Sequence, residues 1–251
     1  MPKEKPTINL AVIIPTLNEQ LFIGKLLDAI IKQTMQPEEI VVVDAFSKDK
    51  TAQEVKIRQK YLPQIKFFQI PKKTVARQRN FGVKKTKSPD ILFLDADMEF
   101  RQKGDLEKYF KEVKTRKPEV AVAKNLPDSN HWKDRVYFEA EDMLFKLSKF
   151  FWPVITARNL YITRKIFNMV GGFNENIAVG EDQELVHRIL GNGGKLIFLK
   201  KVKLHTSARR VIKDGRIRHA LKMMLFGINI ITRGRDKSKV DYEFGHFTTK
   251  N

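Results

Sequence analysis

Short runs of Ile, Val, Leu and Phe alternate with amphipathic stretches along the first half of the chain. The runs have the length and the β-branched composition of buried strands. The stretches between them place apolar residues at helical spacing, as Phe22, Leu26 and Ile30 do after Asn18, a residue type that favours helix starts. We therefore expect strands at 8–14, 39–44, 65–70 and 91–94, and helices after Asn18 and at 50–60, 74–85 and around 106–113.

This alternation predicts an α/β fold, with βαβ units and a mostly parallel central sheet flanked by helices. Parallel strands are covered on both faces, which explains why the runs are apolar throughout. In such sheets ligands bind at the carboxyl ends of the strands. Those ends carry polar residues in the segments 15–19, 44–47 and 95–97. We therefore expect the functional site at this edge of the sheet.

The second half of the chain is less regular. Strands are expected at 120–123 and 195–204, and helices at 163–170 and 181–190. Two further stripes of apolar residues have helical spacing. One runs from Val136 to Phe151, and we expect it to pack on the core, with an acceptor or a membrane as the alternative. The other runs over 216–231, and Arg and Lys residues flank it.

Composition narrows the class of protein. The 251 residues include no cysteine, which excludes a disulfide framework, a zinc finger and a cysteine nucleophile. A hydrophobic content of 42% excludes global disorder. No apolar run approaches the roughly 20 residues that cross a bilayer, and the N-terminus lacks the apolar segment of a secretory signal. We therefore expect a cytoplasmic location.

The net charge of +19 predicts an anionic partner, which is nucleic acid, an acidic membrane surface or a phosphate-bearing substrate. Residues 200–251 contain 14 Lys and Arg but four Asp and Glu, so they carry +10 of this excess. The apolar stripe at 216–231 lies in this region. A basic amphipathic helix either lies on an anionic membrane or packs on its own domain, and the sequence leaves both alternatives open.

Acidic residues carry the candidate chemistry. Asp95 and Asp97 directly follow an apolar strand, a pattern that suits Mg²⁺ or Mn²⁺ shared with phosphate oxygens, although a polar turn has the same pattern. Asp182 begins a helix beside Glu181, where a carboxylate is either a general base or a response to the helix dipole. His205 follows a strand and is either a structural histidine or a further metal ligand.

Two pairs of arginines are candidates for phosphate binding. Arg77 and Arg79 lie in the polar stretch that we expect to be a helix. Arg209 and Arg210 lie in a stretch that we expect to be flexible. Guanidinium groups bind phosphates bidentately, but each pair is also compatible with a solvated surface.

Five segments, in their order along the chain, resemble family 2 glycosyltransferases with the GT-A fold. They are AVIIPTLNE, EIVVVDAFSKDKT, ARQRNFG, ILFLDADM and VGGFNENIAVGEDQELVHRI, and they run from residue 11 to residue 189. Each segment is a weak signal alone, but their order and spacing together are specific.

The resemblance implies a GT-A domain over 1–205, with a nucleotide-binding half at 1–118 and an acceptor-binding half at 119–205. Residues 206–251 would form a basic extension that packs on the domain or on the cytoplasmic face of a membrane. The implied activity is inverting transfer of one sugar from a nucleotide-diphosphate sugar to a hydroxyl of a lipid-linked or cell-envelope glycan. The implied cofactor is Mg²⁺ or Mn²⁺, and no nucleic acid partner is expected.

The resemblance also assigns roles to residues. Asp182 matches the catalytic base, Asp97 the metal-binding acid and His205 a histidine that some relatives use as a further metal ligand. The family often has an acid and a glycine after the position of Asp44, where this chain has Ala45 and Phe46, so the donor's base stays open. The positions expected to bind the nucleotide sugar are Pro15, Thr16, Asn18, Glu19, Asp44, Arg77, Arg79, Asp95, Arg209 and Arg210.

Three other classes of protein share some of these features. A nucleotidyltransferase would have a glycine-rich, lysine-bearing segment after the first strand, and residues 16–24 do not supply one. A non-enzymatic nucleic-acid-binding protein would explain the charge but not the acids at the strand ends, which repel phosphates unless a metal intervenes. A sugar-nucleotide-binding relative without activity is compatible with the sequence.

Overall fold

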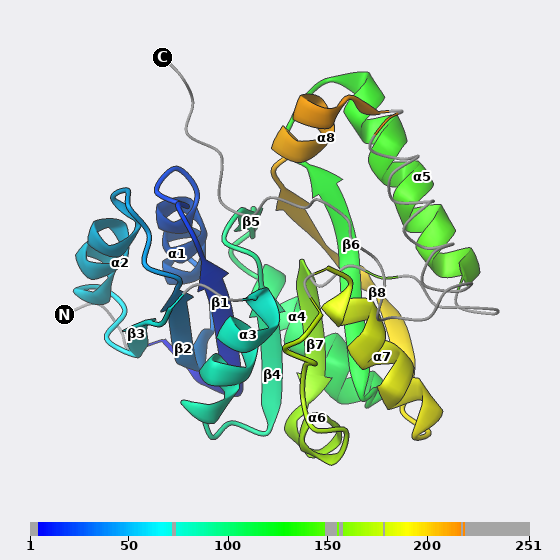
Figure 1. Cartoon of the computed structure of the whole chain (residues 1–251), viewed down its shortest axis with the longest axis horizontal. Coiled ribbons are helices and arrows are strands. Elements are labelled where there is room, and N and C mark those ends of the chain that lie inside the picture. The colour runs from blue at the N-terminus through cyan, green and yellow to red at the C-terminus, as the bar shows by residue number, and fades with distance from the viewer. Residues whose placement is uncertain are drawn as a thin grey trace.

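One eight-stranded sheet forms the centre of the computed structural model, which describes residues 5–71, 74–148, 155, 158–177, 179–216 and 218 (Figure 1). Its strand order is β3-β2-β1-β4-β7-β6-β8-β5. The strands are β1 (Thr7–Thr16), β2 (Gln36–Asp44), β3 (Ile65–Gln69), β4 (Asp90–Leu94), β5 (Met98–Glu99), β6 (Val120–Pro127), β7 (Asn159–Thr163) and β8 (Leu196–Thr206).

The sheet is mostly parallel, which confirms the expected fold class. Strand β1 pairs in parallel with β2 and β4, β2 pairs in parallel with β3, and β6 pairs in parallel with β8. Strand β7 is antiparallel to both β4 and β6, and β5 is antiparallel to β8. The carboxyl ends of β1, β2 and β4 therefore meet at one edge, as expected for an α/β sheet.

Helices cover both faces of the sheet. Apolar side chains of α1, α2 and α4 join one core cluster, and those of α3, α6 and α7 join a second cluster on the opposite face. Strand β1 contributes to both clusters, because Val12 and Ile14 enter the first and Ile13 the second. The helices are α1 (Ile23–Ile31), α2 (Thr51–Gln59), α3 (Val75–Lys84), α4 (Asp105–Arg116), α5 (Trp132–Ser148), α6 (Arg164–Met169), α7 (Glu181–Gly191) and α8 (Arg209–Asp214).

Helix α3 packs directly against β1 at Gly82. A Cβ atom at this position would lie 2.5 Å from Cγ2 of Ile13, closer than real carbon atoms approach. The absence of a side chain at Gly82 lets the helix settle onto the strand, which brings the polar residues of α3 near the strand ends.

Several local expectations were wrong. Asn18 does not cap a helix, because α1 begins only at Ile23 and its N-cap residue is Phe22. The stretch that contains Arg209 and Arg210 is not flexible coil but begins helix α8. The sequence patterns also missed strands β5 and β7.

The apolar stripe on α5 is exposed in its described part, so the expectation that it packs on the core was wrong there. Val136, Met143, Leu144 and Leu147 are all more than half exposed. Helix α5 lies along the β6 side of the molecule, and α8 packs against it (Figure 1). Residues 149–151 of the stripe lie outside the described residues.

The second amphipathic stripe, at 216–231, lies outside the described residues except for Arg216 and Arg218. The Nε atom of Arg216 binds the buried Asp134 of α5 at 2.7 Å. Within the described residues, no helix has both the length and the apolar character needed to span a bilayer.

Candidate active site

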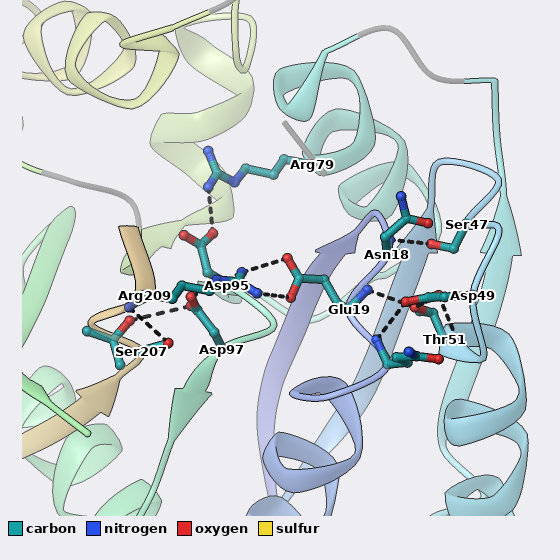
Figure 2. Close-up of polar contacts among 12 residues, drawn as sticks. Asn18, Glu19, Ser47, Asp49, Thr51, Arg79, Asp95, Asp97, Ser207 and Arg209 are labelled. Carbon is teal, nitrogen blue, oxygen red and sulfur yellow. Dashed lines mark hydrogen bonds and ion pairs between the residues drawn. The ribbon is translucent and has the colours of Figure 1, made fainter. Parts of the chain in front are cut away.

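Carboxylates and arginines from distant parts of the chain meet at the carboxyl edge of the sheet (Figure 2). They come from the loops after β1 and β4, from α3, from the start of α7 and from the start of α8. Two arginines, Arg79 and Arg209, each bridge a pair of these carboxylates. The site is therefore a network of buried ion pairs.

Arg209 joins the loops after β1 and β4. Its two terminal nitrogens donate to the two carboxylate oxygens of Glu19 at 2.9 and 2.8 Å, a bidentate geometry (Figure 2). Its Nη2 atom lies 3.3 Å from Oδ2 of Asp97. The guanidinium also lies over the ring of Phe22, 4.3 Å from its centroid. Arg209 therefore neutralises the predicted metal ligand and a predicted donor-binding residue at once.

Burial opposes the negative charge of both partners of Arg209. Burial raises the pKa of Asp97, and the charge of Arg209 only partly lowers it again. The pKa of Glu19 is also raised, first by burial and less by the charge of Asp97, against the hydrogen bonds from Arg209. The charge of Arg209 therefore offsets part of the effect of burial at both acids.

Arg79 forms the second bridge. Its Nη2 atom donates to Oδ1 of Asp95 at 3.0 Å, and its Nη1 atom donates to Oε1 of Glu181 at 2.7 Å. The residue is only 3% exposed, and its guanidinium lies 5.4 Å from the ring centroid of Phe173. Burial lowers the pKa of Arg79, but the charges of Asp95 and Glu181 outweigh burial and raise it overall.

Asp182 lies next to this second bridge. It is half-buried in the first turn of α7, and its Oδ1 atom accepts the N–H of Gln183 at 2.7 Å. Burial, followed by the charge of Asp182, raises the pKa of the neighbouring Glu181 to about 7. The carboxylate pair at 181–182 therefore combines a buried acid held by Arg79 with a more accessible one.

The loops after β1 and β2 are joined by a ladder of hydrogen bonds. The N–H of Asn18 donates to Oγ of Ser47 at 2.8 Å, and the N–H of Glu19 donates to Oγ1 of Thr51 at 2.8 Å (Figure 2). Oδ1 of Asn18 accepts the N–H of Lys48 at 2.9 Å. The ladder fixes the backbone that carries Glu19.

Asp44 is placed inside the protein rather than on the surface of the site. It is 0% exposed, and its carboxylate accepts hydrogen bonds from Thr16 at 2.9 Å, from the N–H of Ser47 at 2.8 Å and from Gln69 at 3.1 Å. These contacts fasten the ends of β1, β2 and β3 together, and the carboxylate offers no exposed surface to a ligand.

The remaining predicted residues fall in different places. Pro15 is buried within β1, Arg77 is half-buried in the first turn of α3, and the charge of Arg210 acts on both Glu19 and Asp97. His205 lies at the end of β8 beside Thr206. The neighbouring Thr206 faces Asp97 at 3.4 Å, whereas Nδ1 of His205 lies 3.2 Å from the carbonyl oxygen of Pro127.

Sequence reasoning missed Arg158. Its carbonyl oxygen accepts the N–H of Asp95 at 3.0 Å, and its guanidinium binds both carboxylate oxygens of Glu141 on α5 at 2.7 and 3.1 Å. Its charge also lowers the pKa of Asp97. No motif surrounds Arg158, and its partner is 17 residues away in the sequence, so no local pattern could have found it.

A metal centre formed by protein side chains alone is not found in the described part of the chain, where no three His, Asp or Glu side chains group around a common point. Asp97 does supply one carboxylate at the site edge. Mg²⁺ and Mn²⁺ typically take one or two carboxylates and complete their shell with waters and substrate phosphates. The residues therefore fit a cation that a bound diphosphate would help to hold.

The family model of glycosyl transferase family 2 matches residues 11–173. Because this match covers more than half of the sequence, the chain belongs to glycosyl transferase family 2. A curated relative, the minor teichoic acid biosynthesis protein GgaB of Bacillus subtilis (strain 168), is 27% identical over 213 residues. These cover 82% of this chain, which spans only 23% of the length of GgaB.

Solved structures show the same GT-A fold. TarS of S. aureus in complex with UDP has a TM-score of 0.63 and 21% identity, over 80% of this chain and 60% of the TarS chain. The mannosyltransferase PcManGT of Pyrobaculum calidifontis, in complex with GDP-Man and Mn²⁺, has a TM-score of 0.69 and 21% identity, over 92% of this chain and 65% of its own. The fold and the order of the motifs agree with the resemblance described above.

Proposed function

We propose that this protein transfers a sugar from a nucleotide-diphosphate sugar to a hydroxyl of a teichoic-acid-type polymer of the cell envelope. The observation that carries the proposal is that the segment with Asp95 and Asp97 is joined by Arg79 to the first turn of α7, which carries Asp182, at the carboxyl edge of a GT-A sheet. The relative GgaB is a teichoic acid biosynthesis protein. Structures with this fold hold UDP, UDP-GlcNAc or GDP-Man, which supports a nucleotide-sugar donor.

Asp182 is the proposed general base. Its carboxylate takes the proton of the acceptor hydroxyl as the hydroxyl oxygen attacks the anomeric carbon. The bond from that carbon to the diphosphate oxygen breaks, and the nucleoside diphosphate leaves with the bonding electrons. Because attack and departure occur on opposite sides of the carbon, the product has the inverted configuration. Asp182 suits this role because it is more accessible than Glu181.

Asp97 is the proposed protein ligand of a divalent cation, Mg²⁺ or Mn²⁺. When bound, such a cation neutralises the charge that develops on the leaving diphosphate. Mn²⁺ in the PcManGT structure supports this choice. Arg209 now holds the Asp97 carboxylate, and Arg210 adds charge beside it. These two arginines are placed to bind the diphosphate once it enters.

A peripheral position on an anionic membrane is the proposed location. The supporting observations are the net charge of +19 and the exposed apolar stripe of α5. Co-sedimentation with vesicles that contain about one third anionic lipid measures this directly. We expect binding at low salt that is lost at high salt, and no binding to anionic vesicles at low salt would refute the location.

The activity is tested with a panel of donors, including UDP-GlcNAc and GDP-Man, with Mn²⁺ and a teichoic acid acceptor. We expect nucleoside diphosphate release and incorporation of the sugar, with proton NMR of the product showing an inverted anomeric configuration. Oligonucleotide binding without turnover of any donor would instead identify a nucleic-acid-binding protein. A retained configuration would refute the role of Asp182 while leaving the transferase class intact.

A further inference from the structure

Three successive residues of α3 bind three different parts of the site. Gln78 donates to the carbonyl oxygens of Thr16 at 2.9 Å and Val43 at 2.7 Å, at the ends of β1 and β2. Arg79 binds Asp95 after β4 and Glu181 at the start of α7. Asn80 binds the loop that leads into α7. Helix α3 therefore contacts every element of the site that precedes α8.

The contacts of Asn80 fix the loop ahead of Asp182. Its Nδ2 atom donates to the carbonyl oxygen of Phe173 at 2.9 Å, and its Oδ1 atom accepts the N–H of Phe173 at 2.9 Å. Asn80 also lies close to the backbone of Gly172. A side chain at this position would place its Cβ atom 2.9 Å from Oδ1 of Asn80, and the φ angle of Gly172 is +73°. Only glycine combines this conformation with this close approach.

The Arg79 side chain is occupied by protein groups on both of its terminal nitrogens. At 3% exposure it offers almost no surface to a donor molecule. Its Nε atom is buried and has no hydrogen-bond partner among the described residues. The two carboxylates that it binds belong to the segment that carries Asp97 and to the helix turn that carries Asp182.

We propose that Arg79 is a positioning residue that sets the distance between the Asp95–Asp97 segment and Asp182, rather than a ligand of the donor. The inference rests on the proposed function, because it concerns the same transfer. Arg79 locks the carboxyl end of β4 to the first turn of α7, so the proposed base and the proposed cation ligand keep one geometry. A shift of about 1 Å between catalytic groups can lower a rate about a hundredfold.

The charge balance explains why an arginine is suited to this position. Asp95 and Glu181 come from different elements, and two carboxylates held close together repel unless a cation lies between them. The planar guanidinium reaches both carboxylates with separate nitrogens. A lysine ammonium is a single point charge that does not fix the direction of its hydrogen bonds. Arg79→Lys therefore keeps the charge and weakens the geometry, and Arg79→Met removes both.

The test separates donor binding from turnover. Calorimetry measures the Kd of the nucleotide that the wild type binds best among UDP and GDP, and single-turnover experiments measure transfer with saturating donor. We expect Arg79→Met to slow transfer at least a hundredfold while the nucleotide Kd stays within threefold. Arg79→Lys should transfer sugar at least tenfold faster than Arg79→Met. Lys84→Met, at an exposed position on the same helix, is the matched control and should match the wild type in both measurements.

A tenfold weaker nucleotide Kd in Arg79→Met, with a transfer rate within threefold of the wild type, would overturn the proposal and make Arg79 a donor ligand. Because Arg79→Met leaves the buried Glu181 and the half-buried Asp95 without their arginine, it can fail to fold. Glu181→Gln then removes the charge from one end of the same link at nearly constant volume, although its amide oxygen can still accept from Arg79. It should show the same split between Kd and rate, with a smaller loss of rate.

Amide hydrogen exchange without any donor provides a readout that does not depend on the activity. We expect Arg79→Lys to speed exchange in residues 180–184 and 95–98 and nowhere else. Unchanged exchange there would refute the link even if the wild type is an active transferase. If the wild type turns over no donor, the proposed function fails, and the exchange pattern still decides whether Arg79 couples the two segments.

Discussion

Individual side chains at the strand ends have roles that depend on partners far away in the sequence. Arg79 lies 16 residues from Asp95 and 102 residues from Glu181. The sequence identified Arg79 as a site residue, but it could not distinguish a carboxylate partner from a diphosphate partner, because both are anions. The same holds for Asp44, whose type and position suggest ligand binding but whose burial is a tertiary property.

Phe46 has an unfavourable backbone conformation and an exposed aromatic side chain. Its φ angle is +53°, a left-handed conformation that costs a residue with a Cβ about 1–2 kcal/mol, and its side chain is 54% exposed. We expect Phe46→Gly to raise the free energy of unfolding by about 1 kcal/mol, measured by urea denaturation. Tyr61→Gly is the matched control, because Tyr61 is also exposed but has no positive φ, and it should lower stability. A loss of stability in Phe46→Gly would contradict the strain.

Arg209 occupies the place beside Asp97 where a divalent cation is proposed. Its guanidinium repels an approaching cation and satisfies the carboxylates of Glu19 and Asp97. We therefore expect Arg209→Gln to bind Mn²⁺ at least tenfold more tightly than the wild type in the absence of nucleotide, as measured by electron paramagnetic resonance of free Mn²⁺. The variant Arg209→Gln/Asp97→Asn should lose this gain. An unchanged Mn²⁺ affinity in Arg209→Gln would mean that Arg209 does not keep a cation away from Asp97.

At the scale of elements, the apolar strands β1, β2 and β4 were predictable because burial on both faces leaves a continuous local pattern. Strand β5 was not, because two residues become a strand only by pairing with β8. Helix α8 has six residues, too few to be stable alone, and it depends on the contact of Val211 with Phe138 of α5. Such elements leave no periodic signal in the sequence.

Strand β8 contains an irregularity that Glu112 of α4 stabilises. The register between β6 and β8 shifts after the pair Ala123 and Leu199. The buried Glu112 carboxylate accepts the N–H groups of Lys200 at 3.0 Å and Lys201 at 2.8 Å in this bulge. Burial raises the pKa of Glu112, but these backbone hydrogen bonds outweigh burial and lower it overall.

The lowered pKa of Glu112 makes the stability that it provides through Lys200 and Lys201 depend on pH. Glu112 holds its proton less tightly in the folded state than in the unfolded state. Its ionised carboxylate therefore contributes to the free energy of unfolding above the unfolded pKa of 4.5, and this contribution is lost as the pH falls through the lower folded pKa. We expect Glu112→Gln to cost about 2 kcal/mol at pH 7 and much less near pH 3, from urea denaturation at each pH. Glu107→Gln, on the exposed side of α4, should cost less at pH 7. An equal cost of Glu112→Gln at both pH values would contradict this account.

For the whole molecule, the basic charge has two parts with different surroundings. Arg79, Arg158 and Arg209 neutralise acids within the site, so they are not a free basic surface. Much of the remaining excess lies in residues 200–251, where the sequence alone left membrane binding and packing on the domain open. The order of five short motifs predicted the family and the fold, because three of them mark the ends of β1, β2 and β4, and the other two lie in α3 and at the start of α7 beside them.

In the proposed reaction, Asp182 removes the acceptor proton at this sheet edge. The most direct measurement is the single-turnover transfer rate of Asp182→Asn with a donor that the wild type uses, because the amide keeps the shape of the side chain and removes the base. General bases contribute roughly 10²–10⁴ to the rate, so we expect transfer to slow at least a hundredfold while the nucleotide Kd is unchanged. Transfer by Asp182→Asn at the rate of the wild type would show that Asp182 is not the base.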